Sequence, residues 1–233
     1  MQVRKLVRFQ AGASACGVAI GVALNVVLTR WLGPKGVPEW VAFVPYLLAV
    51  GLTYALFRVA ADSLVENSQQ LRRALLGNRF VEGPWLEMVH SGDGSIFARI
   101  LYIAFEAQTL RLSGQNFDLN GQPRGTFRSV MVVLDWPVLK YKYDWAARGP
   151  KRPSEGYGEI CFAQTQGAPV FLQGFFVDLD DGLRRTLWGK RLEGTQALAA
   201  LSDPPKLSEM IRAFFAEQGA TSVSEGDAQA AAG

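Results

Sequence analysis

Side chains that commonly act in catalysis and metal binding are scarce in this sequence. His90 is the only histidine, and no cysteine or second histidine stands at a ligand spacing from it, which argues against a zinc site. The two cysteines, Cys16 and Cys161, fall in separate predicted elements; this argues against a disulfide scaffold and is typical of a reducing compartment. No Gly-x-Ser-x-Gly, Walker or glycine-rich dinucleotide motif occurs. The residues therefore give no positive indication of an enzyme, a metal or a cofactor.

Charged side chains are absent from two long apolar segments, residues 11–28 and 40–57. A hydrocarbon core about 30 Å thick needs roughly 20 residues of helix. Each segment reaches this length with its flanking residues, so the sequence predicts a transmembrane hairpin over residues 1–61, with a Gly- and Pro-containing break at 33–38. The alternative is a pair of buried helices in a soluble protein, but such helices usually carry a polar stripe.

Basic residues at the ends of the hairpin predict its orientation. They gather before the first span and after the second, at Arg4, Lys5, Arg8, Arg58, Arg72, Arg73 and Arg79. The cytoplasmic flanks of membrane spans carry an excess of Lys and Arg. We therefore expect both termini in the cytoplasm and the short loop on the other side of the membrane.

The first span contains a GxxxG pair, Gly17 and Gly21. Small residues four positions apart let helix backbones approach closely in lipid. The pair fits either self-association between copies of the chain or packing against the second span of the same chain, and the sequence does not decide between them.

Residues 62–79 are predicted to continue the second span as a helical stalk. Leu64, Leu71 and Leu75 recur at helical spacing among polar residues, and Gly77-Asn78 is a typical helix end. This stalk would connect the hairpin to the next domain.

The pattern changes to short strands from Phe80 to Glu193. β-Branched and aromatic residues dominate these segments, and turn-forming pairs such as Asn120-Gly121 and Asp181-Gly182 separate them. We predict eight strands, at Trp85 to His90, Ile96 to Glu106, Thr109 to Phe117, Thr126 to Leu134, Val138 to Trp145, Tyr157 to Gln164, Val170 to Asp178 and Arg184 to Leu192. Sequential hairpins of this number favour a closed antiparallel up-and-down β-barrel over residues 80–193, with a two-sheet sandwich as the alternative.

The chain is predicted to end in a short helix and a tail. Ser202-Asp203-Pro204-Pro205 is typical of a helix start, and apolar residues then recur at helical spacing up to Gly219. We assign residues 194–218 to this C-terminal helix. Residues 219–233 are small and polar, which predicts disorder.

Aromatic and basic side chains within the barrel are the candidates for ligand binding. A nucleobase stacks on an aromatic ring, and a phosphate binds Arg or Lys. The candidates are Arg99, Arg128, Tyr141, Tyr143, Phe176 and Trp188. For each aromatic residue the simpler interpretation is core packing, and for each arginine it is a solvated or paired charge. Arg99 and Arg128 stand out because each lies amid apolar residues in mid-strand, where a cation must face water or a buried partner.

Long nucleic acid is not an expected partner. The predicted barrel segment contains equal numbers of acidic and basic residues, and the whole chain has a formal charge of only +3. A broad basic surface is therefore lacking, although a pocket for one small anion remains compatible with this composition.

The order of these elements resembles a known family. Two N-terminal spans, a helical stalk and a compact barrel that opens with Glu82-Gly83-x-Trp85 are similar to the two-transmembrane, β-strand-rich effectors of bacterial anti-phage systems that signal through cyclic oligonucleotides. Gly83-Pro84-Trp85 also opens the first strand as a Gly-x-Trp does in lipocalins. The resemblance implies a bacterial inner-membrane protein whose barrel binds a cyclic dinucleotide, whose spans oligomerise, and whose activity disrupts the membrane of the infected cell.

Two other functions are compatible with the same residues. One is a membrane-tethered, lipocalin-like module that binds an apolar ligand or scaffolds a protein partner. The other is a hydrolase whose site has no recognisable motif, and its only histidine would be His90.

Overall fold

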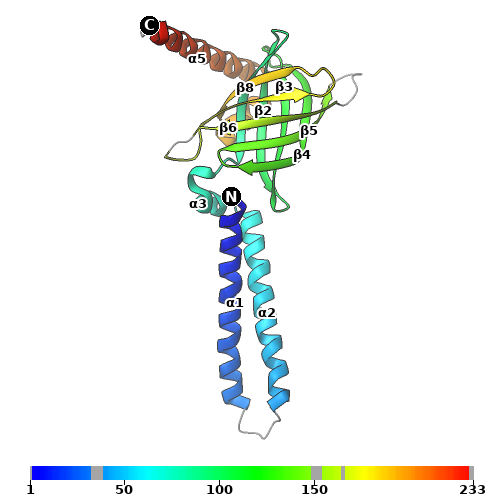
Figure 1. The fold of residues 1–233 in the computed structure, drawn as a ribbon, viewed down its shortest axis with the longest axis vertical. Coiled ribbons are helices and arrows are strands. Elements are labelled where there is room, and N and C mark those ends of the chain that lie inside the picture. The colour runs from blue at the N-terminus through cyan, green and yellow to red at the C-terminus, as the bar shows by residue number, and fades with distance from the viewer. Residues whose placement is uncertain (1, 33–38, 148–153, 164–165, 231–233) are drawn as a thin grey trace. The chain divides into compact units, whose positions relative to one another are not determined.

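A computed structural model describes residues 2–32, 39–147, 154–163 and 166–230. The chain divides into two compact units, Met1–Gly77 and Asn78–Gly233, and each is described by itself. The first unit is helical, and the second contains a closed β-barrel followed by helices (Figure 1).

The first unit is a hairpin of two long helices, α1 (Gln2–Leu32) and α2 (Glu39–Asn67), which lie side by side. Each contains a stretch long and apolar enough to cross a membrane, Leu6–Val27 in α1 and Leu47–Asn67 in α2. The two predicted helices are thus confirmed, and their length and composition meet the requirement of a membrane span.

Small residues form the contact between α1 and α2. A Cβ atom added to Gly21 would lie 2.8 Å from the Val50 Cα, and one added to Gly17 would lie 2.9 Å from the Thr53 carbonyl oxygen. No larger side chain fits at either position. The structure therefore packs the GxxxG pair within the chain, as the second interpretation expects, and self-association between copies stays a prediction.

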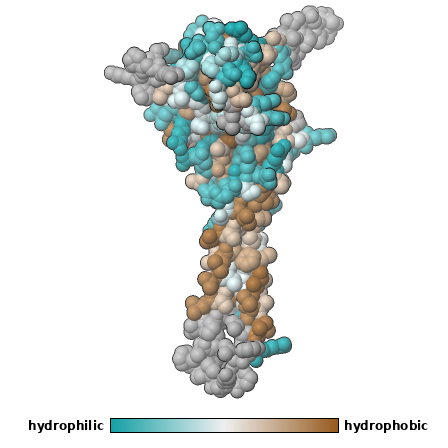
Figure 2. Space-filling model, turned by 180° about the vertical axis from the view of Figure 1, so that it is seen from behind, coloured by the Kyte–Doolittle hydropathy of each residue, from teal (hydrophilic) through white to brown (hydrophobic). Residues whose placement is uncertain are grey.

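Large aliphatic side chains point away from this contact. Val27, Leu48 and Leu52 are 60%, 66% and 63% exposed, and Figure 2 shows apolar residues along the outer surface of both helices. A soluble helical hairpin would bury such residues between its helices. The opposite arrangement, with small residues inside and large aliphatic residues outside, is the one that lipid favours.

The predicted continuous stalk is interrupted at Ser68. Helix α2 ends at Asn67 and α3 spans Gln69–Leu76. The Ser68 hydroxyl accepts a hydrogen bond from the Leu71 amide, as an N-cap does. The buried Arg72 guanidinium donates to the carbonyls of Val65 (2.6 Å) and Glu66 (2.7 Å) at the end of α2. The prediction of one continuous helix was wrong. A serine in a polar stretch fits helical spacing equally well inside a helix and at the start of a new one, so the sequence pattern did not show the break. A short 3-10 turn, Gly77–Arg79, follows α3.

Eight antiparallel strands form a closed barrel in sequence order, and β1 pairs with both β2 and β8. This confirms the predicted up-and-down barrel and excludes the sandwich. The strands are β1 (Gly83–Ser91), β2 (Ile96–Glu106), β3 (Thr109–Phe117), β4 (Pro123–Asp135), β5 (Val138–Ala147), β6 (Ser154–Phe162), β7 (Phe171–Asp178) and β8 (Arg184–Arg191).

Alternation along the strands separates an inner from an outer face. On β5, Leu139, Tyr141 and Tyr143 are buried in the barrel interior, whereas Lys140 and Lys142 are exposed on the outside. The same alternation directs one set of buried apolar residues of the other strands into the barrel interior, while buried residues on the outer face of β1 and β2 form a second cluster.

Inward aromatic rings lie across from glycines. Tyr141 is directly opposite Gly158 and Tyr143 is opposite Gly156. A Cβ atom on Gly158 would lie 2.5 Å from the Tyr141 ring, and one on Gly156 would overlap the Tyr143 ring. An eight-stranded barrel is just wide enough for side chains to fill its interior. A ring therefore fits where the neighbouring strand contributes no side chain.

Two helices follow the barrel, α4 (Gly194–Leu201) and α5 (Pro204–Ala230). Leu207, Ile211 and Phe214 of α5 pack on outward residues of β1 and β2, which include Met88 and Ile100. Helix α5 starts at the predicted position and extends past Gly219, whereas α4 had not been predicted separately because its Ala- and Leu-rich stretch lacks a clear start signal. The predicted disorder of 219–233 concerns motion and stays a prediction.

We predict that Gly158→Ala destabilises the barrel. The added methyl group would overlap the Tyr141 ring, and overpacking of this kind costs about 1–3 kcal/mol. The measurement is the free energy of unfolding of the full chain in detergent. Gly92→Ala is the matched control, because its Cβ would lie 3.7 Å from the nearest atom. Equal stabilities of the two variants would contradict the requirement for glycine at position 158.

Candidate ligand-binding site

One end of the barrel is closed by aromatic rings. Trp85 and Phe162 lie 5.4 Å apart between ring centroids, and Trp136 stacks on Phe162 at 6.0 Å. The Trp85 indole N–H donates to the Val81 carbonyl at 3.0 Å. The Arg191 guanidinium lies over the Trp85 ring, 5.4 Å from its centroid. We call this end, where β1 begins, the closed end.

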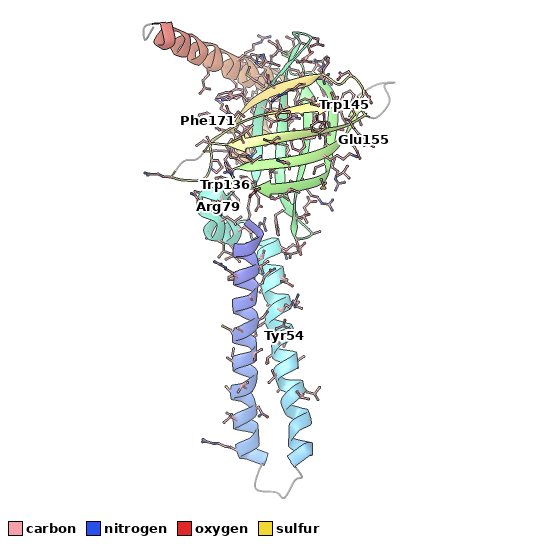
Figure 3. The ribbon with its side chains drawn as sticks, viewed as in Figure 1. Tyr54, Arg79, Trp136, Trp145, Glu155 and Phe171 are labelled. Carbon is pink, nitrogen blue, oxygen red and sulfur yellow. The ribbon has the colours of Figure 1, made fainter. Side chains whose placement is uncertain are left out.

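Polar side chains face inward at the opposite end. Trp136 and Trp145 lie near the two ends of β5 and mark the two ends of the barrel (Figure 3). Because alternate residues of a strand share a face, the inward positions at the second end are Ser91, Asn116, Trp145, Ser154, Asp178 and Arg185. We call these six residues the polar mouth.

Three polar atoms of the polar mouth are buried and have no hydrogen-bond partner among the residues that the structure describes. They are Ser91 Oγ, Asn116 Oδ1 and Trp145 Nε1. The large majority of buried polar atoms in proteins are paired with protein or water. A molecule that enters the mouth therefore meets two hydrogen-bond acceptors, Ser91 Oγ and Asn116 Oδ1, and one donor, the Trp145 indole N–H. The Ser91 hydroxyl can also donate.

A network of charges occupies another part of the mouth. Arg185 contacts Asp178 at 2.9 Å and Asp181 at 2.5 Å, and the Tyr143 hydroxyl donates to Asp178. The hydrogen bond from Arg185 lowers the pKa of Asp181, while burial and the Asp178 carboxylate raise the pKa of Tyr143 well above its usual value. The Asp181 carboxylate is therefore ionised at neutral pH, and Tyr143 remains a hydrogen-bond donor.

A second cation lies at this end on a β-bulge. The pairing between β3 and β4 shifts between Asn116 and Phe117, and this shift leaves Arg124 as the extra residue of β4. Its guanidinium lies over the inward Phe97 ring, 5.7 Å from the centroid. Bulges often redirect a side chain at a barrel rim, and here the side chain is a cation beside the polar mouth.

A buried ion pair lies deeper in the barrel. Arg99 donates to Glu87, and the two side chains are only 2% and 0% exposed. Burial raises the pKa of Glu87, and the Arg99 guanidinium opposes that rise. The guanidinium also lies over the rings of Phe127 (4.6 Å) and Phe176 (4.8 Å). These contacts stabilise a charge that would otherwise be costly to bury.

Tyr141 lies beside this pair. Burial raises the pKa of Tyr141, and the nearby Arg99 charge opposes the rise, although the two groups do not form a hydrogen bond of good geometry. Its ring is tilted against that of Tyr143 at 5.8 Å. Tyr143 then connects this pair of rings to Asp178 at the mouth.

Four of the six predicted site residues therefore meet inside the barrel: Arg99, Tyr141, Tyr143 and Phe176. The other two lie on the outer face. Arg128 is exposed on β4, and Trp188 stacks on Phe214 of α5 at 4.7 Å. Neither can share a site with the inner four, because their strand positions direct them away from the interior.

Sequence reasoning missed the residues of the polar mouth. Trp145 and Asp178 each end a predicted strand and Asn116 lies one residue before such an end, where polar residues are common and carry no distinctive signal. Only the register of the closed barrel shows that these strand ends form one ring. The available signal would have been polar residues at the inward-facing positions of those strand ends that meet at one end of the barrel.

The chain is thus an eight-stranded antiparallel barrel preceded by two long apolar helices. No family model and no curated protein matches it. It is similar to two solved redesigned β-barrels. One is mFAP1 bound to DFHBI, with 17% identity over 48% of this chain and 94% of that chain and a TM-score of 0.38. The other has 16% identity over 48% of this chain and 92% of that chain, with a TM-score of 0.39. Likeness at this level identifies neither a family nor a function.

We predict that the buried ion pair stabilises the fold only as a pair. Glu87→Leu leaves the Arg99 charge buried alone and costs about 3–5 kcal/mol, whereas the double variant Glu87→Leu/Arg99→Met recovers most of that loss. Chemical unfolding of the full chain, followed by tryptophan fluorescence, measures both values. Removal of the exposed Lys142–Glu155 pair on the outer face is the control and has little effect. Additive losses in the double variant would contradict the prediction.

Proposed function

We propose that this chain is a membrane-anchored effector of bacterial anti-phage defence. In this proposal its cytoplasmic barrel binds a cyclic dinucleotide at the polar mouth, and the bound state promotes oligomerisation of the spans and disruption of the inner membrane. The observation that supports it best is a combination within one chain: a helical hairpin with a lipid-compatible outer surface, and a barrel with two arginines and unpartnered polar atoms at one end.

The hairpin supports the membrane location. Its glycines are buried between the helices, and its large aliphatic residues are exposed along both. In water this surface would be an unusually long apolar patch. In a bilayer the same surface contacts hydrocarbon and needs no further partner.

The polar mouth supports a ligand that carries both phosphates and bases. A cyclic dinucleotide has two phosphates, which bind guanidinium groups well, and the structure places Arg124 and Arg185 at this end. Its bases offer hydrogen-bonding edges to the buried donor and acceptors of the mouth. Among the described residues, the closed end is lined mainly by apolar and aromatic side chains, and its Arg191 guanidinium donates to the backbone carbonyls of Phe80, Glu82 and Pro169.

The charge network supplies a way for the ligand to change the protein. Arg185 is bound by Asp178 on β7 and by Asp181 in the turn between β7 and β8. A phosphate that binds Arg185 competes with Asp181 and thereby alters that turn. The ligand then shifts the population toward the assembled state by its difference in affinity for the two states.

The second candidate function is a membrane-tethered, lipocalin-like module that binds an apolar ligand. The aromatic and aliphatic lining of the closed half favours it. Binding of a fluorescent fatty acid that cyclic dinucleotides do not displace would support this module in place of the effector.

We predict that Arg185→Gln and Arg124→Gln each weaken the binding of cyclic dinucleotides by roughly 10-fold or more, because each removes a charge-assisted contact to phosphate. Isothermal titration calorimetry of the full chain in detergent measures the affinities. Arg128→Gln is the matched control: it removes an arginine from the outer face of the same barrel, and we expect it to leave binding unchanged. If Arg128→Gln alone lost binding, the site would lie on the outer face of the barrel and not at the polar mouth.

We also predict that membrane damage requires the hairpin. Cells that express the full chain and receive the ligand should take up a membrane-impermeant dye, whereas cells that express a chain without residues 1–61 should exclude it. Calorimetry on the shortened chain shows whether it still binds the ligand. Dye uptake without the hairpin, or a full chain that remains in the supernatant after ultracentrifugation without detergent, would contradict the proposed anchor.

A further inference from the structure

We infer that Asn116 and Trp145 form a base-reading pair in the polar mouth and select adenine in the bound ligand. This inference rests on the proposed function, since it assigns the base specificity of the same site. Neither residue is among the aromatic and basic candidates that the sequence provided.

The two side chains stand over the same gap in the barrel wall. Asn116 on β3 lies directly opposite Gly125 on β4, and directly opposed residues have Cβ positions about 4.5–5.5 Å apart. A Cβ atom on Gly125 would lie 3.0 Å from Trp145 Nε1 and 2.7 Å from the Ala146 carbonyl oxygen. Gly125 therefore places no side chain between the two residues, and Asn116 and the Trp145 indole N–H both lie beside it.

The two groups are complementary in hydrogen bonding, yet Asn116 Oδ1 and Trp145 Nε1 have no partner among the described residues. Asn116 is only 9% exposed, and its Oδ1 is unpaired, as is the buried Nε1 of Trp145. The indole N–H can only donate, whereas the amide both donates and accepts. Buried groups of this kind are costly to leave unpaired, so the site favours a ligand edge that satisfies both.

The chemistry of the pair favours adenine. Asparagine binds an edge that places an N–H donor next to a ring-nitrogen acceptor, as the 6-amino group and N7 of adenine do. A further ring nitrogen of adenine can accept from the Trp145 indole N–H. Guanine presents the carbonyl O6 in place of the 6-amino group, so its O6/N7 edge offers two acceptors to a side chain that needs one donor and one acceptor.

The test compares cyclic di-AMP and cyclic di-GMP by calorimetry on the full chain in detergent. Trp145→Phe keeps an aromatic ring but removes the donor, and it should weaken cyclic di-AMP binding by roughly 10-fold or more. Asn116→Asp should shift the preference toward cyclic di-GMP, because a carboxylate accepts from the adjacent N1–H and 2-amino donors of guanine. Arg185→Gln should weaken both ligands alike.

Two substitutions on the outer face serve as matched controls. Gln115→Leu removes an amide from the neighbouring outward position on β3, and Trp188→Phe removes an indole N–H beneath α5. Neither should change the ratio of the two affinities. Far-ultraviolet circular dichroism of each variant verifies that the barrel is folded.

The outcomes separate this inference from the proposed function. If the unmodified chain binds a cyclic dinucleotide and the ratio of affinities is the same in Asn116→Asp, the base-reading pair is wrong and the effector proposal stands. If the unmodified chain binds no cyclic dinucleotide, both are overturned. A preference for cyclic di-AMP that Asn116→Asp reverses would establish the pair.

Discussion

The narrow interior of a closed eight-stranded barrel is the constraint on which the rest of the second unit depends. Each large inward ring needs a neighbouring position without a side chain, as Tyr141 has at Gly158 and Phe127 has at Gly114. Rings that lie against the wall leave their faces free toward the interior. The guanidinium of Arg99 lies over one of these rings, so the glycines that allow the packing also provide the environment of the buried charge.

Polarity changes along the barrel from the closed end to the polar mouth. Trp85 and Phe162 fill the closed end, the Arg99–Glu87 pair lies farther along, and Arg185 is held at the mouth by carboxylates. In the deep pair each charge balances the other, although Glu87 Oε1 and Arg99 Nη2 have no hydrogen-bond partner among the described residues. The mouth combines charges that an anion can compete for with polar atoms that have no partner within the described residues. We assign ligand recognition to the mouth because Arg185 and Asp181 are partly exposed there, and a structural role to the interior pair because it is almost fully buried.

The helical hairpin follows the opposite packing rule to the barrel. Gly17 and Gly21 are buried between α1 and α2, while large aliphatic residues such as Leu48 and Leu52 face outward. Because the glycines are already used within the chain, contacts between copies in the proposed assembly involve the outer aliphatic surfaces. Such surfaces interact about equally well with lipid and with each other, so a modest bias from the ligand-bound barrel is sufficient to change their association.

The sequence by itself determined the elements, because hydrophobic period and turn residues are local properties. The hydrophobic pattern predicted the two apolar helices and the bounds of β2 and β3 to the residue. It did not distinguish Arg99 from Arg128, since both are arginines amid apolar residues in mid-strand. The tertiary structure decided that one is buried and the other exposed, and that Asn116 and Trp145 both lie beside Gly125. Those outcomes depend on strand register, on a bulge and on closure of the barrel, which are set by contacts between residues far apart in the chain.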